Sequence, residues 1–487
     1  MAEKNVTSYR RTDRDDQFNR ESILGGEFSL EQCCTAAEEG NADAQDLLGD
    51  CYQYGWHVNR DYTAAVAWYE KASEQGHAAA QRSLGWCYKN GYGVEQSDEK
   101  AAYWYRKGAE GGDADAQHNL GTCYDYGRGV KIDKHEAAKW YRKAAEQGHE
   151  WAQYNLGVCC ERGMGTEQNL QEAVEWYTKS AEQGYVNAQY NLGHCFYSGL
   201  GVAQDFEKAV EWYGKAAAQG DANALSQLGV CYQCGEGVEQ DNGIAVEWYR
   251  KAAERGHCIG QYNLALCYYN GEGVEQDYRK AMEWYGKAAK QGNADAQYMI
   301  AFGYENGEGV EQDYGKAVEW YEKAARQGDA DSEYELAVCY ENGKGVNQDY
   351  GKAAEWYRKA AEQEYAQAQD KLGNFYAHGT GVDQDKEQAA GWYEKAAKQG
   401  IMNSQLNAGV CYYMGIGVPQ DMEKAVMWFD KAAEQGSAVA QYNLGLCYGT
   451  GRGVTMDVEK AAELFRKAAA QGDQNAQVAL MKLGYYE

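Results

Sequence analysis

The sequence predicts an all-α protein: a right-handed α/α superhelical solenoid of about twelve 36-residue helix-turn-helix repeats, with capping half-repeats. The first observation is a 36-residue period that runs from Gly49 to Gly445 without insertion or deletion. The second is a tryptophan that keeps the same step from Trp68 to Trp428. Because no unit of this size buries its apolar face alone, each unit must pack on the next.

Residues 294–328 represent one repeat. Ala296, Ile300 and Tyr304 recur at steps of three and four, which predicts a first helix from Ala294 to about Glu305. The glycines of NGEGV then supply the positive φ angles that a turn between antiparallel helices requires.

The second helix of the repeat begins at Asp313. This position holds a capping residue in every repeat, and a cap stabilises a helix by about 1 kcal/mol. Trp320 and Tyr321 belong to the buried stripe, and Gly328 ends the helix in a left-handed conformation. Glu364 replaces this terminal glycine in one repeat, so we expect a locally altered helix end there.

The two ends of the chain depart from the repeat. Residues 1–25 form a polar segment that we expect to be disordered, and residues 26–487 are expected to form a single solenoid. Residues 30–40 resemble the second half of a repeat without its tryptophan, which places Cys33 in a capping helix. A final helix is expected from Gln474 to about Tyr485.

Composition excludes several classes of function. With 74 acidic and 47 basic residues, the net charge of −27 repels phosphate backbones and disfavours nucleic acid as a partner. No apolar stretch reaches the length of a membrane span, and the N-terminal segment lacks an apolar core for export. Ten of the 15 cysteines recur two residues after the glycine position, at a spacing too wide for disulfides. We therefore expect buried, reduced thiols and a cytoplasmic location.

The consensus A-x-A-Q-Y-N-L-G-x-C-Y-x-N-G-x-G-V resembles the Sel-one-like repeat family over residues 30 to 487. The resemblance implies a fold related to tetratricopeptide repeats and roles as adaptors or scaffolds. Secreted, cysteine-rich members, to which β-lactamase activity has been attached, have paired cysteines at the positions of Gln297 and Ala325. Because this framework is absent here, a secreted, disulfide-stapled protein is disfavoured.

Two motifs that resemble catalytic or metal sites have simpler explanations. Ser97 and Lys100 match the S-x-x-K of serine β-lactamases, but Ser97 stands at the helix-capping position and no partner motif follows. Cys231 and Cys234 form the sole C-x-x-C, but Cys231 lies in the recurrent core position and His257 lies about a helix length away. We expect no enzymatic activity, no cofactor and no metal.

The related tetratricopeptide architecture implies that the first helix of each repeat lines a concave groove. Three positions before the glycine stand Tyr154, Tyr190, Tyr262, Tyr298, Tyr334 and Tyr442. Beside them stand Asn119, Asn155, Asn191, Asn263, Asn407 and Asn443. Four positions after the glycine stand Asp125, Glu161, Tyr197, Tyr269, Glu305, Glu341 and Tyr413.

Tyrosines offer rigid contact area, and asparagine amides can hydrogen-bond an extended peptide backbone. The asparagines can equally bind the adjacent repeat while the tyrosines cover the inner wall. We therefore expect a non-enzymatic scaffold that binds a basic or neutral protein or peptide in an acidic Tyr/Asn-rich groove. The alternatives are a secreted or surface effector that binds a host factor, and a β-lactamase-type hydrolase. The sequence leaves the oligomeric state open.

Overall fold

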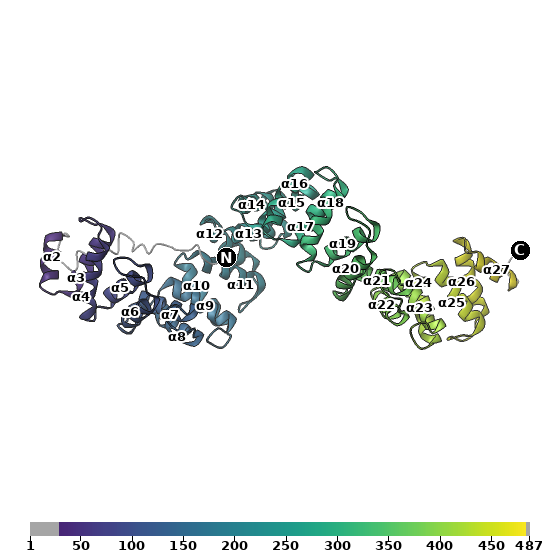
Figure 1. Ribbon diagram of the computed structural model, residues 1–487, viewed down its shortest axis with the longest axis horizontal. Helices are drawn as coiled ribbons and strands as arrows, with labels where there is room; N and C mark the ends of the chain where they lie inside the picture. Colours follow the sequence, from purple (N-terminus) through teal and green to yellow (C-terminus); the bar gives the residue numbers. More distant parts are fainter. Residues whose placement is uncertain (1–28, 484–487) are drawn as a thin grey trace. The chain divides into compact units, whose positions relative to one another are not determined.

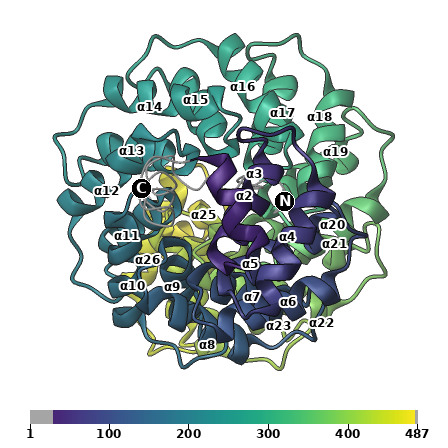
Figure 2. The same ribbon diagram turned by 90° about the vertical axis from the view of Figure 1, so that its left-hand side faces the viewer.

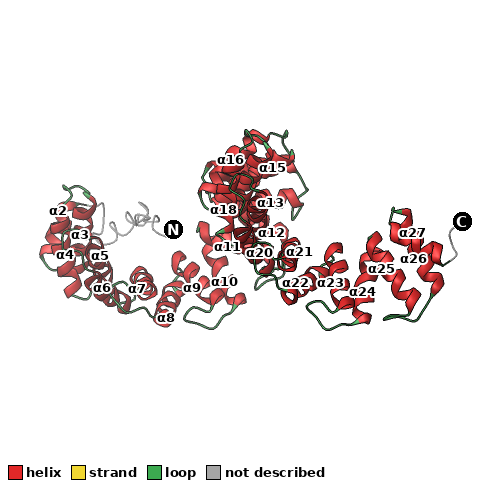
Figure 3. Cartoon of the chain, turned by 45° about the vertical axis from the view of Figure 1, so that its right-hand side comes forward, coloured by secondary structure: helices red, strands yellow, loops and turns green. Residues whose placement is uncertain are grey.

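The computed structural model describes residues 29–483, so the predicted polar segment 1–25 lies outside the described residues. Within residues 29–483 there are 26 helices and no strands. Figure 3 colours these helices red and the loops between them green. The all-α prediction of helix-turn-helix repeats is therefore confirmed.

The helices alternate between two types along the chain. The A helices, which contain the glycine position, are α3 (Ala42–Tyr54), α5 (Ala78–Asn90), α7 (Ala114–Tyr126), α9 (Glu150–Arg162), α11 (Val186–Ser198), α13 (Ala222–Cys234), α15 (Cys258–Asn270), α17 (Ala294–Asn306), α19 (Ala330–Asn342), α21 (Ala366–His378), α23 (Met402–Met414), α25 (Ala438–Thr450) and α27 (Gln474–Lys482). The B helices, which follow the turn, are α2 (Leu30–Glu38), α4 (Tyr62–Glu74), α6 (Asp98–Glu110), α8 (Lys134–Glu146), α10 (Leu170–Glu182), α12 (Phe206–Ala218), α14 (Asn242–Glu254), α16 (Tyr278–Lys290), α18 (Tyr314–Ala325), α20 (Tyr350–Glu362), α22 (Lys386–Lys398), α24 (Met422–Glu434) and α26 (Val458–Ala470).

The chain divides into two compact units, Met1–Trp248 and Tyr249–Glu487, and the division falls within α14 (Figure 1). Within the first unit, α9 and α11 lie on the inner side of the curve relative to α10 and α12. Within the second unit, α15 and α17 lie inside α16 and α18 in the same way (Figure 2). The single solenoid over residues 26–487 and its right-handed superhelix stay predictions.

Both ends of α18 follow the predicted chemistry. The Asp313 carboxylate accepts a hydrogen bond from the Lys316 backbone N–H at 3.0 Å, and Gly328 has φ 86°. In the turn before this helix, Gly309 has φ 72°, and a Cβ there would lie 2.3 Å from the Tyr278 carbonyl oxygen. Only glycine fits this point, where one repeat's turn meets the preceding B helix.

Glu364 adopts the left-handed conformation, with φ 66°, which confirms that it occupies the terminal glycine position. The expected alteration of the helix end is wrong. The Glu364 N–H donates to the Ala361 carbonyl at 3.1 Å, and the Tyr365 N–H donates to the Ala360 carbonyl at 3.1 Å. Gly328 makes the equivalent bond to Ala325 at 3.0 Å. Retained hydrogen bonds therefore outweigh a strain of about 1 kcal/mol.

The centre of the core is the tyrosine that follows the repeated tryptophan. Tyr213, Tyr285 and Tyr321 are all fully buried. The tryptophans range from buried to half-buried: Trp428 is 2 % exposed, whereas Trp284 is half-buried. A lysine three residues later covers the ring, with Lys287 Nζ 3.4 Å from the Trp284 centroid. The tryptophan row is therefore packed by the protein itself, in agreement with a core role.

A ladder of glutamines links neighbouring repeats. Gln297 Nε2 donates to the Ala289 carbonyl at 3.1 Å, and Gln327 Nε2 donates to Gln297 Oε1 at 2.8 Å. The same pair of bonds recurs along both units, for example at Gln153 and Gln183. The position that holds a cysteine in secreted relatives thus holds a buried hydrogen-bonding group here.

Two predictions are confirmed within the described residues: the recurrent cysteines are buried and form no disulfides, and a capping helix stands at each end of the repeat array. No disulfide is present there, and the ten recurrent cysteines are buried. Burial raises the pKa of the Cys123 thiol to about 11, so this thiol stays protonated and unreactive at neutral pH. Helix α2 carries Cys33, and α27 begins at Gln474 and ends at Lys482, three residues before the predicted end.

Candidate functional site

The inner surface of the A helices carries the side chains that the repeat does not use for its core. We call this surface the inner face; it comprises the residues two and three positions before the glycine position, and one, four and five positions after it. In the first three repeats, Asp46, Arg82 and His118 stand where six of the nine later repeats have tyrosine. Asp46 is only 5 % exposed and Arg82 only 8 %. Burying such charges requires partners.

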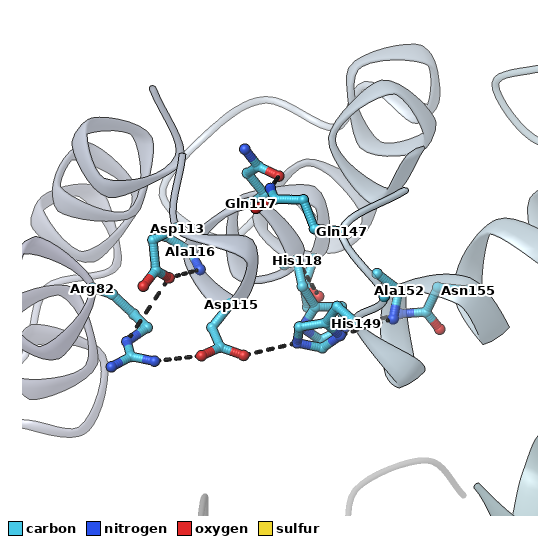
Figure 4. Close-up of polar contacts among 12 residues, drawn as sticks. Arg82, Asp113, Asp115, Ala116, Gln117, His118, Gln147, His149, Ala152 and Asn155 are labelled. Carbon is cyan, nitrogen blue, oxygen red and sulfur yellow. Dashed lines mark hydrogen bonds and ion pairs between the residues drawn. The ribbon is translucent and has the colours of Figure 1, made fainter. Parts of the chain in front are cut away.

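Arg82 is held by two aspartates of the next repeat (Figure 4). Its Nε lies 3.9 Å from Asp113 Oδ1, and its Nη1 donates to Asp115. The second oxygen of Asp115 lies 3.0 Å from His149 Nε2. This chain of contacts ties α5, α7 and α9 together and compensates the charge of the buried guanidinium.

Two stacked histidines continue this network. His149 Nδ1 accepts a hydrogen bond from the Ala152 backbone N–H at 3.1 Å, so it caps α9 while Nε2 faces Asp115. The His118 ring stacks on His149 at a centroid distance of 4.7 Å. Burial, and then the neighbouring His149, lowers the pKa of His118 well below its usual value. A neutral His118 fits a structural role better than acid-base chemistry.

A cleft opens on the inner face between α3, α5 and α7. Its walls combine an acid, a cation, two aromatic rings and three neutral polar groups: Asp50, Gln53, Tyr54, Arg82, Ser83, Trp86 and Asn119. Of these residues, only Asn119 was predicted to lie on this face. The available signal was the replacement of the tyrosine row by charged residues in these repeats.

The predicted tyrosine row lies half-buried in both units. Each ring packs by one side against the buried tyrosine or phenylalanine of its own repeat. Tyr190 lies 5.8 Å from Tyr213, and Tyr298 lies 5.8 Å from Tyr321, measured between centroids. The same packing is seen for Tyr154, Tyr262, Tyr334 and Tyr442. The tyrosines are neither sealed in the core nor fully exposed.

The asparagine row is also half-buried, and two of its members contact their own protein. Asn155 Nδ2 lies 3.1 Å from His118 Nε2 of the preceding repeat. Asn191 hydrogen-bonds the hydroxyls of Tyr154 and Tyr177. In this part of the row the asparagines stabilise neighbouring repeats. Asn263, Asn407 and Asn443 lie at the same half-buried position.

The row four positions after the glycine is engaged with neighbouring groups. Where this position is a glutamate, its carboxylate accepts a hydrogen bond from the hydroxyl of the buried tyrosine: Glu161 from Tyr177, Glu305 from Tyr321 and Glu341 from Tyr357. Asp125 instead accepts from Lys134 Nζ at 2.7 Å. Where this position is a tyrosine, its side chain contacts the turn of the following repeat. The Tyr197 hydroxyl donates to Glu236 and the Tyr269 hydroxyl to Glu308, both at 2.6 Å. The Tyr413 hydroxyl accepts from Arg452 at 2.8 Å. These residues therefore contribute to repeat stacking as well as to the inner face.

An acidic cluster on the second unit was missed because it uses the asparagine position. Glu335 stands there, next to Tyr334 and near Glu305 and Asp331. Burial, and then the charge of Glu305, raises the pKa of Glu335 to about 7. Lys344 Nζ, 3.7 Å from Glu305, offsets only part of this charge. The sequence feature that could have revealed this cluster is Glu335, which stands at a position that holds asparagine in several other repeats.

No catalytic arrangement emerges around the residues that the motifs singled out. Ser97 caps α6, accepting from the Lys100 backbone N–H at 3.2 Å, and its hydroxyl donates to Glu99 at 3.0 Å. Over residues 29–483, no group of three or more histidines, cysteines or acidic residues is placed to hold a metal ion. None of the helices in that range is long and apolar enough to cross a membrane.

The architecture defines an α/α repeat solenoid, and comparison with known proteins gives the family. The Sel1 repeat model matches twelve consecutive segments between residues 42 and 473, so the chain belongs to the Sel1 repeat family. The matched segments are 42–77, 78–113, 114–149, 152–185, 186–221, 222–257, 259–293, 294–329, 330–365, 366–401, 403–437 and 438–473. Proteins of this family generally mediate protein–protein interactions and are generally non-catalytic scaffolds.

Two solved structures are similar over long stretches. A protective antigen present in uropathogenic Escherichia coli strains, with an SLR fold, is 37 % identical, with a TM-score of 0.71 over 94 % of this chain and 98 % of that chain. A Sel1 repeat protein from Oxalobacter formigenes is 36 % identical, with a TM-score of 0.52 over 63 % of this chain and 90 % of that chain. Among curated proteins there is no match.

Proposed function

We propose that this chain is a non-enzymatic scaffold whose inner face holds a basic or neutral segment of a partner protein. The observation that supports this most strongly is the acidic cluster of Glu305, Asp331 and Glu335 beside Tyr298 and Tyr334 in the second unit. Glu335 is a partly buried carboxylate near another carboxylate, which makes its ionised form unfavourable. A lysine or arginine from a partner would relieve this repulsion and gain contact with the tyrosine rings.

The half-buried tyrosines suit such a partner. Each ring is held on one side by the core, so little side-chain entropy is lost when its other side covers a ligand. The net charge of −27 attracts basic segments over long range and repels nucleic acid. Association driven in this way weakens as salt shortens the range of the field.

The test is selection of dodecapeptides from a random phage-displayed library on the full-length protein. We expect enrichment of lysine and arginine, with binding that falls in about 0.5 M salt. The Glu305→Gln/Glu335→Gln variant should lose this preference. Glu319→Gln is the matched control, because Glu319 is exposed on the B helix of the same repeat. Selection of acidic peptides, or equal selection by both variants, would refute the proposal.

A surface or secreted role is the second candidate. It is favoured by the similarity to the Escherichia coli protein, which is described as a protective antigen. The cytoplasmic location that we propose first rests on the reduced, buried cysteines. Fractionation of the source cells separates the two: protein in the cytosolic fraction supports the first, and protein at the cell surface or in the medium supports the second.

A further inference from the structure

The asparagine row of the inner face is interrupted in the second unit. The position two residues before the glycine position holds asparagine in α15, Met299 in α17 and Glu335 in α19. In α21 it holds Lys371, whose Nζ lies 3.0 Å from Glu341, so the protein itself compensates that charge. Asparagine returns in α23 and α25. Met299 and Glu335 therefore form a short stretch of the inner face with its own chemistry, between α15 and α21.

This stretch is continuous from α17 to α19. Phe302, which follows the glycine position of α17, stacks on Tyr298 at a centroid distance of 6.3 Å. Burial, and then the charge of Glu335, raises the pKa of Tyr298 to about 12, so the Glu335 carboxylate lies near the Tyr298 ring. Tyr298, Met299, Phe302 and Glu335 are all half-buried, which leaves part of each side chain for a partner. An apolar surface on α17 thus adjoins a carboxylate on α19.

Asn263 on α15 indicates the conformation of the partner segment. It is half-buried, and its side-chain amide forms no hydrogen bond within residues 29–483. Asn155 and Asn191, by contrast, are engaged by neighbouring repeats. A side-chain amide offers donors and an acceptor, which match the N–H and C=O groups of a peptide backbone. A helical segment pairs these groups internally, so the Asn263 amide favours an extended segment.

The spacing of the A helices sets the spacing of the partner's side chains. Equivalent positions on neighbouring A helices lie about 8–10 Å apart. A polyproline II segment has three residues per turn and advances about 3.1 Å per residue, so side chains three positions apart point the same way at about 9 Å. In a β-strand, side chains on one face lie two or four positions apart, at about 7 or 14 Å. The polyproline II spacing therefore matches this surface, and the strand spacing does not.

We propose that the inner face of α15, α17 and α19 selects a polyproline II segment in which an apolar residue stands three positions from a lysine or arginine. The apolar side chain covers Met299 and Phe302. The cation reaches Glu335 and offsets the repulsion from Glu305. The Asn263 amide binds the backbone of the same segment. This inference rests on the proposed function, and it adds which residues are recognised and how far apart they stand.

Composition-matched peptides test the spacing directly. Each is a fluorescein-labelled, amidated dodecapeptide of glycine and serine that carries one leucine and one lysine, two, three, four or seven positions apart, in both orders. Because all carry the same charge, long-range attraction is equal across the set. Fluorescence polarisation with the full-length protein in about 20 mM salt should show about fivefold or more tighter binding at a separation of three, in one order or both. Equal binding across the set, or tightest binding at two, four or seven positions, would overturn the proposal.

Two variants that restore the asparagine of the row assign the contacts. Met299→Asn should reduce the preference for a separation of three to about twofold or less, while binding still depends on the lysine. Glu335→Asn should remove the difference between the lysine peptide and the same peptide with glutamine in place of lysine. Asparagine stands at this position in α15, α23 and α25, so the repeat accommodates both changes.

Met427→Asn is the matched control, because Met427 is 41 % exposed on the B helix α24. It should leave the spacing preference and the lysine dependence unchanged. Retained lysine dependence in Met299→Asn shows that this variant is folded. An unchanged spacing preference in Met299→Asn, or its loss in Met427→Asn, would overturn the assignment of the apolar contact and with it the motif.

The outcomes separate this proposal from the proposed function. Binding that requires lysine at any separation from leucine supports the proposed function and overturns the motif. Absence of binding by the whole set, together with enrichment of basic peptides from the random library, does the same. Absence of basic enrichment from the library refutes the proposed function itself.

Discussion

The buried tyrosine of each B helix provides the sharpest test of this account, because one substitution should have opposite effects in two adjacent repeats. Tyr285 and Tyr321 are both fully buried in the second unit. The Tyr321 hydroxyl donates to Glu305 Oε2 at 2.8 Å, whereas the Tyr285 hydroxyl has no hydrogen-bond partner within residues 29–483. Tyr285→Phe and Tyr321→Phe therefore remove the same atom from different surroundings.

The expected magnitudes follow from these contacts. A hydrogen bond to a charged acceptor contributes about 1.5–3 kcal/mol, so Tyr321→Phe should destabilise its repeat by about that amount. Leaving a hydroxyl buried and unpaired costs about 1–3 kcal/mol, so Tyr285→Phe should stabilise its repeat by about 1 kcal/mol. Phenylalanine fits this position, since Phe429 and Phe465 occupy it in two later repeats.

Local opening is the appropriate measure, because a long repeat protein need not unfold in one step. Hydrogen exchange followed by mass spectrometry gives the opening free energy of peptides from α16 and α18. We expect higher protection of α16 in Tyr285→Phe and lower protection of α18 in Tyr321→Phe. Changes of the same sign and similar size in both variants would refute the assignment of hydroxyl partners.

Three further predictions concern single positions. Glu364→Gly should stabilise its repeat by about 1 kcal/mol, because it removes a non-glycine residue from φ 66°; no gain in chemical denaturation would contradict this. Asp313→Ala should lower local stability by about 1 kcal/mol through loss of the α18 cap, seen as faster exchange at its first turn. The pKa of Glu335 is raised from 4.5 to about 7, because its ionised form is unfavourable in the folded state. Ionisation of Glu335 therefore destabilises the folded state fully above pH 7. The destabilisation decreases as the pH falls from 7 to 4.5 and is absent below pH 4.5. Glu335→Gln should therefore match the unmodified protein near pH 4 and exceed it by about 1–2 kcal/mol above pH 7, after allowance for partial solvent screening; a difference independent of pH would contradict the assignment.

The repeat predicted most of the fold because each position recurs in the same environment. The boundaries of α17 and α18, the caps and the left-handed positions follow from the local chemistry of glycine, aspartate and apolar spacing. The helix end at Glu364 was mispredicted because a strain of about 1 kcal/mol is too small to disrupt two hydrogen bonds imposed by the repeat.

The sites were harder to predict because they arise where the repeat is broken. Arg82 is held by residues about 30 positions later, and its burial depends on packing between repeats. The acidic cluster depends on Glu335, which takes the asparagine position next to Tyr334 and near Glu305. The sequence displays both substitutions, but it does not show which charged groups they meet in the fold.

Hydrogen exchange of the full-length protein, with and without a selected basic dodecapeptide, tests whether the inner face binds the peptide. We expect protection in peptides from α17 and α19, which carry Glu305, Tyr334 and Glu335, and little change in the outer B helices α16 and α18. Protection confined to α16 and α18, or no protection at saturating peptide, would contradict binding at the inner face.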